Sequence, residues 1–125
     1  MPTLVGIMEG ILDNKTLAMK IGQIVYAKKG ENVTLVDISE RSSFADFFVN
    51  VTASNERMLS AMADEVDGKM EKEEGITPKN IEGTPSSGWI LVDYGDIIIN
   101  LFLPAQRELY QIEKIWADGE IINIE

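Results

Sequence analysis

Residues 88–116 read GWILVDYGDIIINLFLPAQRELYQIEKIW, which is two apolar runs around a short turn and then an amphipathic segment. The runs at 89–94 and 97–103 are rich in β-branched and aromatic residues, which suit a pleated and largely buried surface. Gly95, in the turn between them, can take the positive φ angle that a tight hairpin needs. Pro104 suits the first turn of a helix, because the N–H that proline lacks would have no partner there. We therefore predict two antiparallel strands that pass directly into a helix.

In that helix, Leu109, Ile112 and Trp116 recur at helical spacing and form one apolar stripe. An apolar stripe needs a surface to cover, and the preceding hairpin is the nearest one. We expect the helix to pack on the hairpin as a structural element. The polar side chains of its other face are expected to remain in solvent: Arg107, Glu108, Gln111 and Lys114.

The chain has 125 residues, enough for a single domain with its own core. It contains no cysteine and no histidine, which excludes disulfides, thiolate catalysis, the usual zinc sites and histidine acid–base chemistry. Its net charge of -10 opposes direct binding to nucleic acid and to anionic membranes, and favours a basic partner. The N-terminal sequence lacks the cationic start of a signal peptide, so we expect a cytoplasmic protein.

The first half of the chain predicts one helix and two strands. Residues 1–13 are either a short helix or a loosely held extension, because two glycines interrupt their apolar spacing. Asn14 can cap a helix that ends near Gly30. The short apolar runs at 33–38 and 47–52 then read as strands of a growing sheet.

A second helix begins after Ser54 or Asn55, either of which can cap it, and ends at Gly75. Its methionines could form a groove for a partner helix, but their spacing favours core packing against the sheet. Its carboxylates read as a solvated face rather than a metal site, because Lys69 and Lys72 interrupt them.

Two later segments leave alternatives open. Residues 76–83 are either a short edge strand or an extended loop, since Pro78 favours an edge. The tail 119–125 either adds a short strand or stays mobile. We expect the domain proper to span 14–118. The order of elements predicts a mixed sheet flanked by helices, an α/β or α+β sandwich.

Four blocks of the sequence resemble, in order and spacing, the Iojap-like ribosomal silencing factors. They are SSFADFFV at 42–49, IEG at 81–83, GWILVDYGDIIINLF at 88–102 and RELYQIEKIWAD at 107–118. The resemblance covers about residues 15–118, and its tryptophan, DYGD turn, strand and helix form a specific combination.

This resemblance implies a nucleotidyltransferase-like α/β fold without the enzyme's active site and without a cofactor. It also implies binding to the large ribosomal subunit through a basic ribosomal protein of the L-fourteen family. Occupying that face would block subunit association and so repress translation. One departure from the family is visible, because Asn100 stands where the family usually has a histidine.

On this basis the hairpin is the expected partner-binding site. Aromatic residues supply area that can be buried in an interface, and carboxylates pair with lysine or arginine. Alternation along the first strand puts Trp89, Leu91 and Asp93 on one side, so Trp89 reads either as a core residue or as an exposed anchor. The expected site residues are Trp89, Asp93, Tyr94, Gly95, Asp96, Asn100 and Phe102, with Ser43 and Asp46 nearby.

The sequence leaves two alternative functions open. A metal-dependent nucleotidyltransferase would use Asp46, Asp93 and Asp96, but such an enzyme needs two carboxylates two residues apart on one strand, and a glycine-serine turn for phosphate. The sequence has neither, since Ser43 and its neighbouring serine follow Arg41 rather than a glycine. A structural dimerisation domain is the other alternative, because an uncovered edge strand permits a symmetric homodimer.

Overall fold

The computed structural model describes residues 13–40, 42–110 and 120–124. Their elements follow the chain in an α-β-β-α-β-β-β-α-β order, with one short 3-10 helix, η1. The bounds are α1 Asn14–Ala27, β1 Glu31–Asp37, β2 Phe47–Thr52, α2 Glu56–Glu74, β3 Asn80–Thr84, η1 Pro85–Ser87, β4 Trp89–Asp93, β5 Ile97–Phe102, α3 Pro104–Tyr110 and β6 Ile121–Ile124.

The six strands form one sheet in the order β3-β4-β5-β2-β1-β6. Strands β2 and β5 at its centre are parallel, and the other neighbouring pairs are antiparallel. The predicted mixed sheet flanked by helices is therefore confirmed, as a single α/β domain.

The predicted hairpin is also confirmed. Strand β4 pairs antiparallel with β5, with Trp89 opposite Phe102 and Asp93 opposite Ile98. In the turn, Gly95 has a φ of 94°, a region that residues with a side chain rarely adopt. The Asp93 carboxylate accepts a hydrogen bond from the Gly95 N–H at 2.7 Å. The turn therefore depends on both the glycine and the aspartate.

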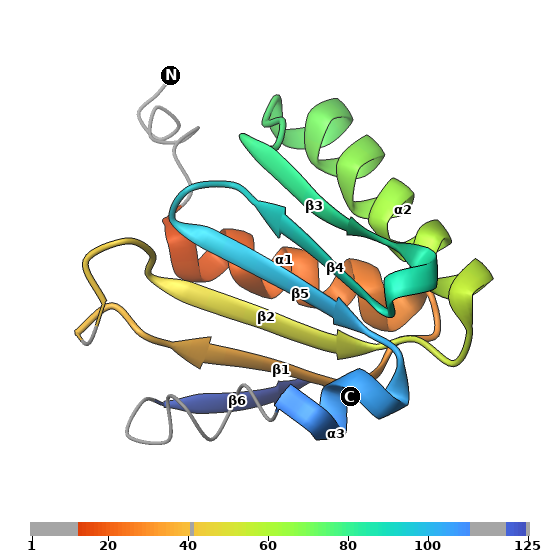
Figure 1. Cartoon of the computed structure of the whole chain (residues 1–125). Helices are drawn as coiled ribbons and strands as arrows, with labels where there is room; N and C mark the ends of the chain where they lie inside the picture. The colour runs from red at the N-terminus through yellow and green to blue at the C-terminus, as the bar shows by residue number, and fades with distance from the viewer. Residues whose placement is uncertain (1–12, 41, 111–119, 125) are drawn as a thin grey trace.

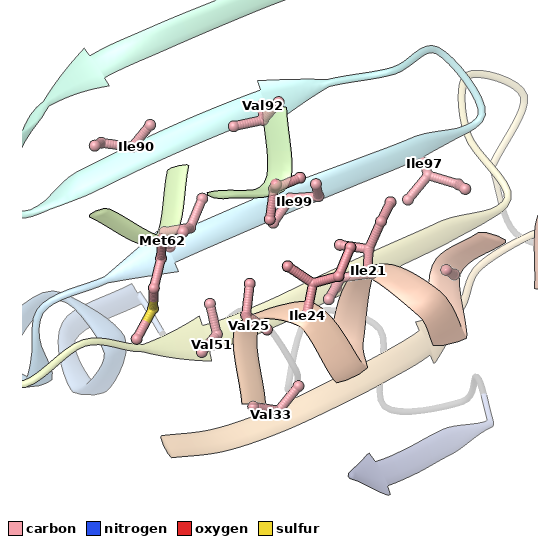
Figure 2. Close-up of a cluster of buried hydrophobic side chains, with 14 of the residues drawn as sticks. Ile21, Ile24, Val25, Val33, Val51, Met62, Ile90, Val92, Ile97 and Ile99 are labelled. Carbon is pink, nitrogen blue, oxygen red and sulfur yellow. The ribbon is translucent and has the colours of Figure 1, made fainter. Parts of the chain in front are cut away.

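Helices α1 and α2 cover one face of the sheet, whereas α3 lies on the other face (Figure 1). Between the two long helices and the sheet lies the main core, shown in Figure 2. Ile21 and Val25 of α1 are fully buried there, as is Met62 of α2. Met70 is 1% exposed, so the prediction that the methionines fill the core is confirmed for these two. The face covered by α1 and α2 thus forms the main core.

The predicted start and end of α2 are confirmed, because Asn55 caps it through the Met58 N–H and Gly75 ends it in the left-handed region. The predicted cap of α1 is wrong by one residue. The Asp13 carboxylate, not Asn14, accepts from the Thr16 N–H at 2.7 Å. That hydrogen bond lowers the pKa of Asp13. Asn14 is already helical, and its side-chain amide donates instead to the carboxylate of Asp46, just before β2.

Both open alternatives for the late segments are settled. Within residues 76–83 and just beyond, β3 forms an edge strand that pairs antiparallel with β4. In the 119–125 tail, β6 pairs antiparallel with β1 and completes the other edge of the sheet. Residues 1–12 of the segment predicted at 1–13, a short helix or a loosely held extension, lie outside the described residues.

The predicted stripe of the last helix is wrong at Leu109, which is 72% exposed. Successive helical residues are about 100° apart, so residues three or four apart share a face. Arg107 and Tyr110 form the face of α3 that contacts the sheet, and Leu109 points away from it. The solvated position predicted for Arg107 is therefore wrong as well. Ile112 and Trp116 lie outside the described residues.

Candidate partner-binding surface

A row of polar side chains crosses the sheet face opposite α1 and α2. Strand pairing places Leu91 opposite Asn100, Asn100 beside Asn50, and Asn50 opposite Thr34. Asn50 is fully buried, and Asn100 and Thr34 are 1% and 8% exposed. Polar groups at such depth must be hydrogen-bonded, or their burial would destabilise the fold.

The row forms a continuous hydrogen-bonded network. The Trp89 indole Nε1 donates to Asn100 Oδ1 at 3.0 Å. Asn100 Nδ2 donates in turn to Asn50 Oδ1 at 3.1 Å. Asn50 Nδ2 then reaches Thr34 Oγ1 at 3.5 Å, the long limit of a hydrogen bond. The network begins at an aromatic residue of β4 and ends on β1.

Arg107 joins this network from α3. Its guanidinium donates to Thr52 Oγ1 at 3.0 Å, to the Asn32 carbonyl at 2.8 Å and to Thr34 Oγ1 at 3.5 Å. These acceptors come from β1 and β2, which are distant from Arg107 in sequence. Sequence reasoning missed Arg107 for that reason. The placement of Asn50 and Thr52 on one side of β2 was the available signal, because polar residues inside an apolar strand need partners.

Trp89 is a half-buried anchor rather than a residue of the main core. Its ring lies 5.2 Å from the Phe102 ring and 4.5 Å from the Tyr110 ring, measured between centroids. Phe102 is fully buried beneath it, whereas Tyr110 is 44% exposed. Offset and tilted rings at these distances attract one another beyond simple area burial. Tyr110 is thus an aromatic of this surface that sequence reasoning did not single out.

The predicted contact roles of Asn100 and Phe102 need correction. Both side chains are buried in the folded chain, so neither presents a surface to a partner. Asn100 holds the indole N–H of Trp89, and Phe102 supports its ring. Both residues therefore support Trp89 from inside the fold.

The predicted carboxylates gather at the opposite end of the hairpin. The backbone N–H of Asp46 donates to the Asp96 carbonyl at 2.7 Å, which brings the start of β2 beside the turn. Asp46 Oδ2 accepts from Asn14 Nδ2 at 2.8 Å. Asp96 is exposed, and Asp93 is partly exposed on the same sheet face as Trp89. This acidic turn therefore leaves carboxylate oxygens open to solvent.

Tyr94 does not belong to the exposed part of the turn. Its ring packs against the core under α1 and α2, and its hydroxyl is buried with no hydrogen-bond partner among the described residues. Burial raises the pKa of Tyr94 to about 12, and the Asp67 carboxylate adds to the rise. Tyr94, one of the predicted contact residues, is only partly exposed, and its hydroxyl lies inside the fold.

The loop before β2 adds two exposed residues near the acidic turn. Ser43 is exposed, as a contact residue must be. Its neighbour Phe44 is 57% exposed and lies 6.4 Å from the ring of Phe48. Sequence reasoning did not single out Phe44, although a phenylalanine between serines and an aspartate was visible.

The predicted site residues thus form two groups rather than one. The aromatic group is Trp89 with Tyr110, and the acidic turn is centred on Asp93 and Asp96. Asp93 lies four positions after Trp89 on β4, which is about 13 Å along an extended strand. Both groups lie on or beside one sheet face.

The nucleotidyltransferase alternative requires carboxylates that share a cation. In the described part of the chain, no three acidic, histidine or cysteine side chains lie close enough to hold a metal ion. Asp93 Oδ1 already accepts a hydrogen bond from the Gly95 N–H, and Asp46 Oδ2 accepts one from Asn14 Nδ2. This arrangement gives no support to metal-assisted nucleotidyl transfer.

Comparison with known proteins identifies the family. The profile described as "Ribosomal silencing factor during starvation" matches residues 12–125. The chain belongs to the ribosomal silencing factor family. A member from Halalkalibacterium halodurans is 32% identical over 114 residues, which cover 91% of this chain and 97% of that protein. The Bacillus subtilis member is 30% identical over 98 residues, covering 78% and 82%.

Solved structures and a more distant relative agree with this family. A crystal structure from Chromobacterium violaceum superposes with a TM-score of 0.79 at 29% identity, covering 85% of this chain and 88% of that one. A mouse protein named mitochondrial assembly of ribosomal large subunit protein 1 is 29% identical over 114 residues, which span 50% of its length. Among the helices that the structure describes, none has the length and apolar character needed to cross a membrane.

Proposed function

We propose that this silencing factor binds the large ribosomal subunit through a basic protein of the L-fourteen family and blocks association with the small subunit. Translation would be repressed as a result. The observation that carries the proposal is the sheet face opposite α1 and α2. This face combines a tryptophan held by a hydrogen bond with solvent-accessible carboxylates, in a chain that belongs to the ribosomal silencing factor family. Interfaces commonly rely on such aromatic anchors with charged residues around them.

The proposed contacts divide between the two groups. Trp89 and Tyr110 would supply buried area, because both rings retain exposed surface. Asp93, Asp96 and Asp46 would face basic side chains of the partner. Gly95 and Ser43 would be the small residues that let the partner approach the turn. Asn100, Phe102 and Tyr94 would act from inside, by holding the strands and rings in place.

Two further facts support this proposal. The net charge of -10 suits a basic ribosomal protein and disfavours direct contact with ribosomal RNA. A mouse relative is named for assembly of the large ribosomal subunit. The proposal places the protein with ribosomes in the cytoplasm, without membrane and without a cofactor. The outer edges of β3 and β6 carry no further strand in the described residues, so self-association must be measured alongside.

Co-sedimentation tests the proposal directly. Purified protein is mixed with isolated large or small subunits and centrifuged, and the formation of joined ribosomes is then followed. We expect binding to the large subunit only and fewer joined ribosomes. Asp96→Lys should weaken this binding more than Glu71→Lys, which makes the same charge change on an exposed face of α2. Equal binding to both subunits, or normal subunit joining at saturation, would exclude the proposed function.

A further inference from the structure

A pocket of about 260 Å³ lies beside the aromatic group, between β3, β4, η1 and α3. Its lining residues are Glu82, Gly83, Ser87, Trp89, Leu91 and Tyr110. This volume is smaller than the range typical of pockets for drug-sized ligands, so it suits a single side chain. No residue of the acidic turn lines it.

Most polar groups of this pocket already form hydrogen bonds within the chain. The Trp89 indole N–H already donates to Asn100. The Ser87 hydroxyl lies within hydrogen-bond distance of the Thr84 carbonyl at 2.8 Å and accepts from the Thr84 N–H at 3.2 Å. Glu82 is exposed, and its Oε2 accepts a hydrogen bond from Asn80 Nδ2 at 2.6 Å. The Glu82 carboxylate therefore keeps acceptor capacity for a ligand.

The walls are apolar and aromatic. Glu82 lies directly opposite Leu91 across the antiparallel pair, so the carboxylate and the apolar wall face the same space. The Trp89 and Tyr110 rings form the far side. Among the described residues no lysine or arginine lines the pocket, so its negative charge is not neutralised there.

We infer that this pocket binds an arginine side chain of a protein partner. A guanidinium is planar and weakly hydrated, stacks on aromatic rings and pairs with a carboxylate. Its aliphatic stem would contact Leu91 while its head lies between Trp89 and Glu82. The net charge of -10 raises the local concentration of basic segments around the chain. Nucleic acid fits less well, because Glu82 and the whole chain repel phosphate.

The assignment of this arginine to the ribosomal partner rests on the proposed function. The preference of the pocket for arginine does not depend on that proposal. No strand of the described residues pairs with the outer edge of β3, and an extended segment could run along this edge next to the pocket. An arginine of such a segment would enter the pocket as one contact of a larger interface. The pocket would then determine which basic segment is accepted.

The test is an NMR titration of the ¹⁵N-labelled full chain with short capped peptides that differ only at one central residue. We expect the arginine peptide to shift the Trp89 indole signal, the lysine peptide to shift it less, and the citrulline peptide to leave it unchanged. Citrulline keeps the shape of arginine without the charge. Trp89→Phe assigns the indole signal. Equal shifts with arginine and citrulline, or a larger shift with a short RNA oligonucleotide, would overturn the inference.

Glu82→Gln provides the second measurement. Because Glu82 is exposed, the variant should fold normally and weaken arginine-peptide binding by roughly threefold, within the range of an exposed ion pair. Glu71→Gln on α2 is the matched control and should bind as the unmodified chain does. If Glu82→Gln binds equally well, the pocket does not recognise arginine. Ribosome binding measured separately distinguishes this failure from failure of the proposed function.

Discussion

Asn100 serves two neighbours at once from a buried position. Its amide oxygen accepts from the Trp89 indole and its amide nitrogen donates to Asn50. A side chain that lacks one of these functions would leave a buried polar atom without a partner, which costs about 1–3 kcal/mol. An amide does not titrate, so this link is the same at every physiological pH. Asparagine therefore gives Trp89 a support that acid does not remove.

Asn100→His should make the stability of the fold depend on pH. A neutral imidazole can accept from Trp89 and donate to Asn50, but an imidazolium can only donate. Burial and the indole donor would hold the pKa of the new histidine below its ordinary value in the folded state. The unfolded chain would then bind the proton first, so stability is full near neutral pH and declines as pH falls. Urea unfolding between about pH 8 and pH 5 checks this.

The unmodified chain is the control for that series, since it contains no histidine. Parallel curves for the variant and the unmodified chain would show that position 100 does not contact Trp89 through hydrogen bonds.

Tyr94→Phe should stabilise the protein. The Tyr94 hydroxyl is buried without a hydrogen-bond partner in the part of the chain that the structure describes, so its removal should raise the free energy of unfolding by about 1 kcal/mol. The raised pKa, about 12 against an ordinary 10.0, means that the unfolded tyrosine ionises first above pH 10. Stability is thus lost as pH rises through that range, and the variant should lose less. Tyr26→Phe is the control, because Tyr26 is 47% exposed.

Denaturation at neutral and alkaline pH measures both effects. If Tyr94→Phe destabilises the chain while Tyr26→Phe does not, the hydroxyl has a partner in solution.

At the scale of elements, α3 is attached to the sheet by Arg107 and by the Tyr110 ring. The guanidinium has three acceptors, two on β1 and one on β2. Hydrogen bonds that involve a charged group contribute about 1.5–3 kcal/mol. Because the same helix carries Tyr110, loosening it should also disturb the ring that packs on Trp89.

Arg107→Met should therefore lower the free energy of unfolding by about 2 kcal/mol and broaden the Trp89 indole signal. Methionine keeps the aliphatic bulk and removes the donors. Arg57→Met, on an exposed position of α2, is the matched control. Guanidinium unfolding and NMR spectra give the two readouts. An unchanged indole signal would mean that α3 does not determine the position of Trp89.

How much the sequence could predict also depends on the element. The hairpin and α2 were predictable because their signals are local: alternation, a glycine in the turn, a cap and an apolar stripe. The orientation of α3 was not, because it depends on acceptors at Asn32, Thr34 and Thr52 that only the folded sheet brings near Arg107. The aromatic group and the acidic turn are separate because the length of β4 lies between Trp89 and Asp93. Residue type alone does not indicate this separation.

At the scale of the whole molecule, the charge of -10 should affect how fast a complex forms more than how long it lasts. Raising monovalent salt should slow association of this silencing factor with the large subunit, because exposed charges are screened beyond about 10 Å at 0.1 M. Saturating protein should still block subunit joining, since a domain with a radius of gyration of about 14 Å obstructs a tight interface by its size. Stopped-flow light scattering at several salt concentrations separates the two effects.

Charge reversals in the same assay locate the contact. Asp93→Lys and Asp96→Lys should reduce binding more than Glu71→Lys. Glu73 is unsuitable as a control, because it pairs with Lys20 at 2.8 Å. Equal losses from all three variants would show that attraction is spread over the surface rather than concentrated at the acidic turn.

The parallel pairing of β2 with β5 has a consequence for how the chain is made. These strands are neighbours at the sheet centre, yet α2, β3 and β4 lie between them in sequence. During synthesis, β1 and β2 leave the ribosome long before β5 exists, and the N-terminal half cannot complete the sheet alone. Such non-local pairing slows folding. Until β5 is synthesised, the exposed edge of β2 can pair with non-native segments. We therefore expect native structure to appear late and abruptly, only after Phe102 has cleared the exit tunnel of a translating ribosome.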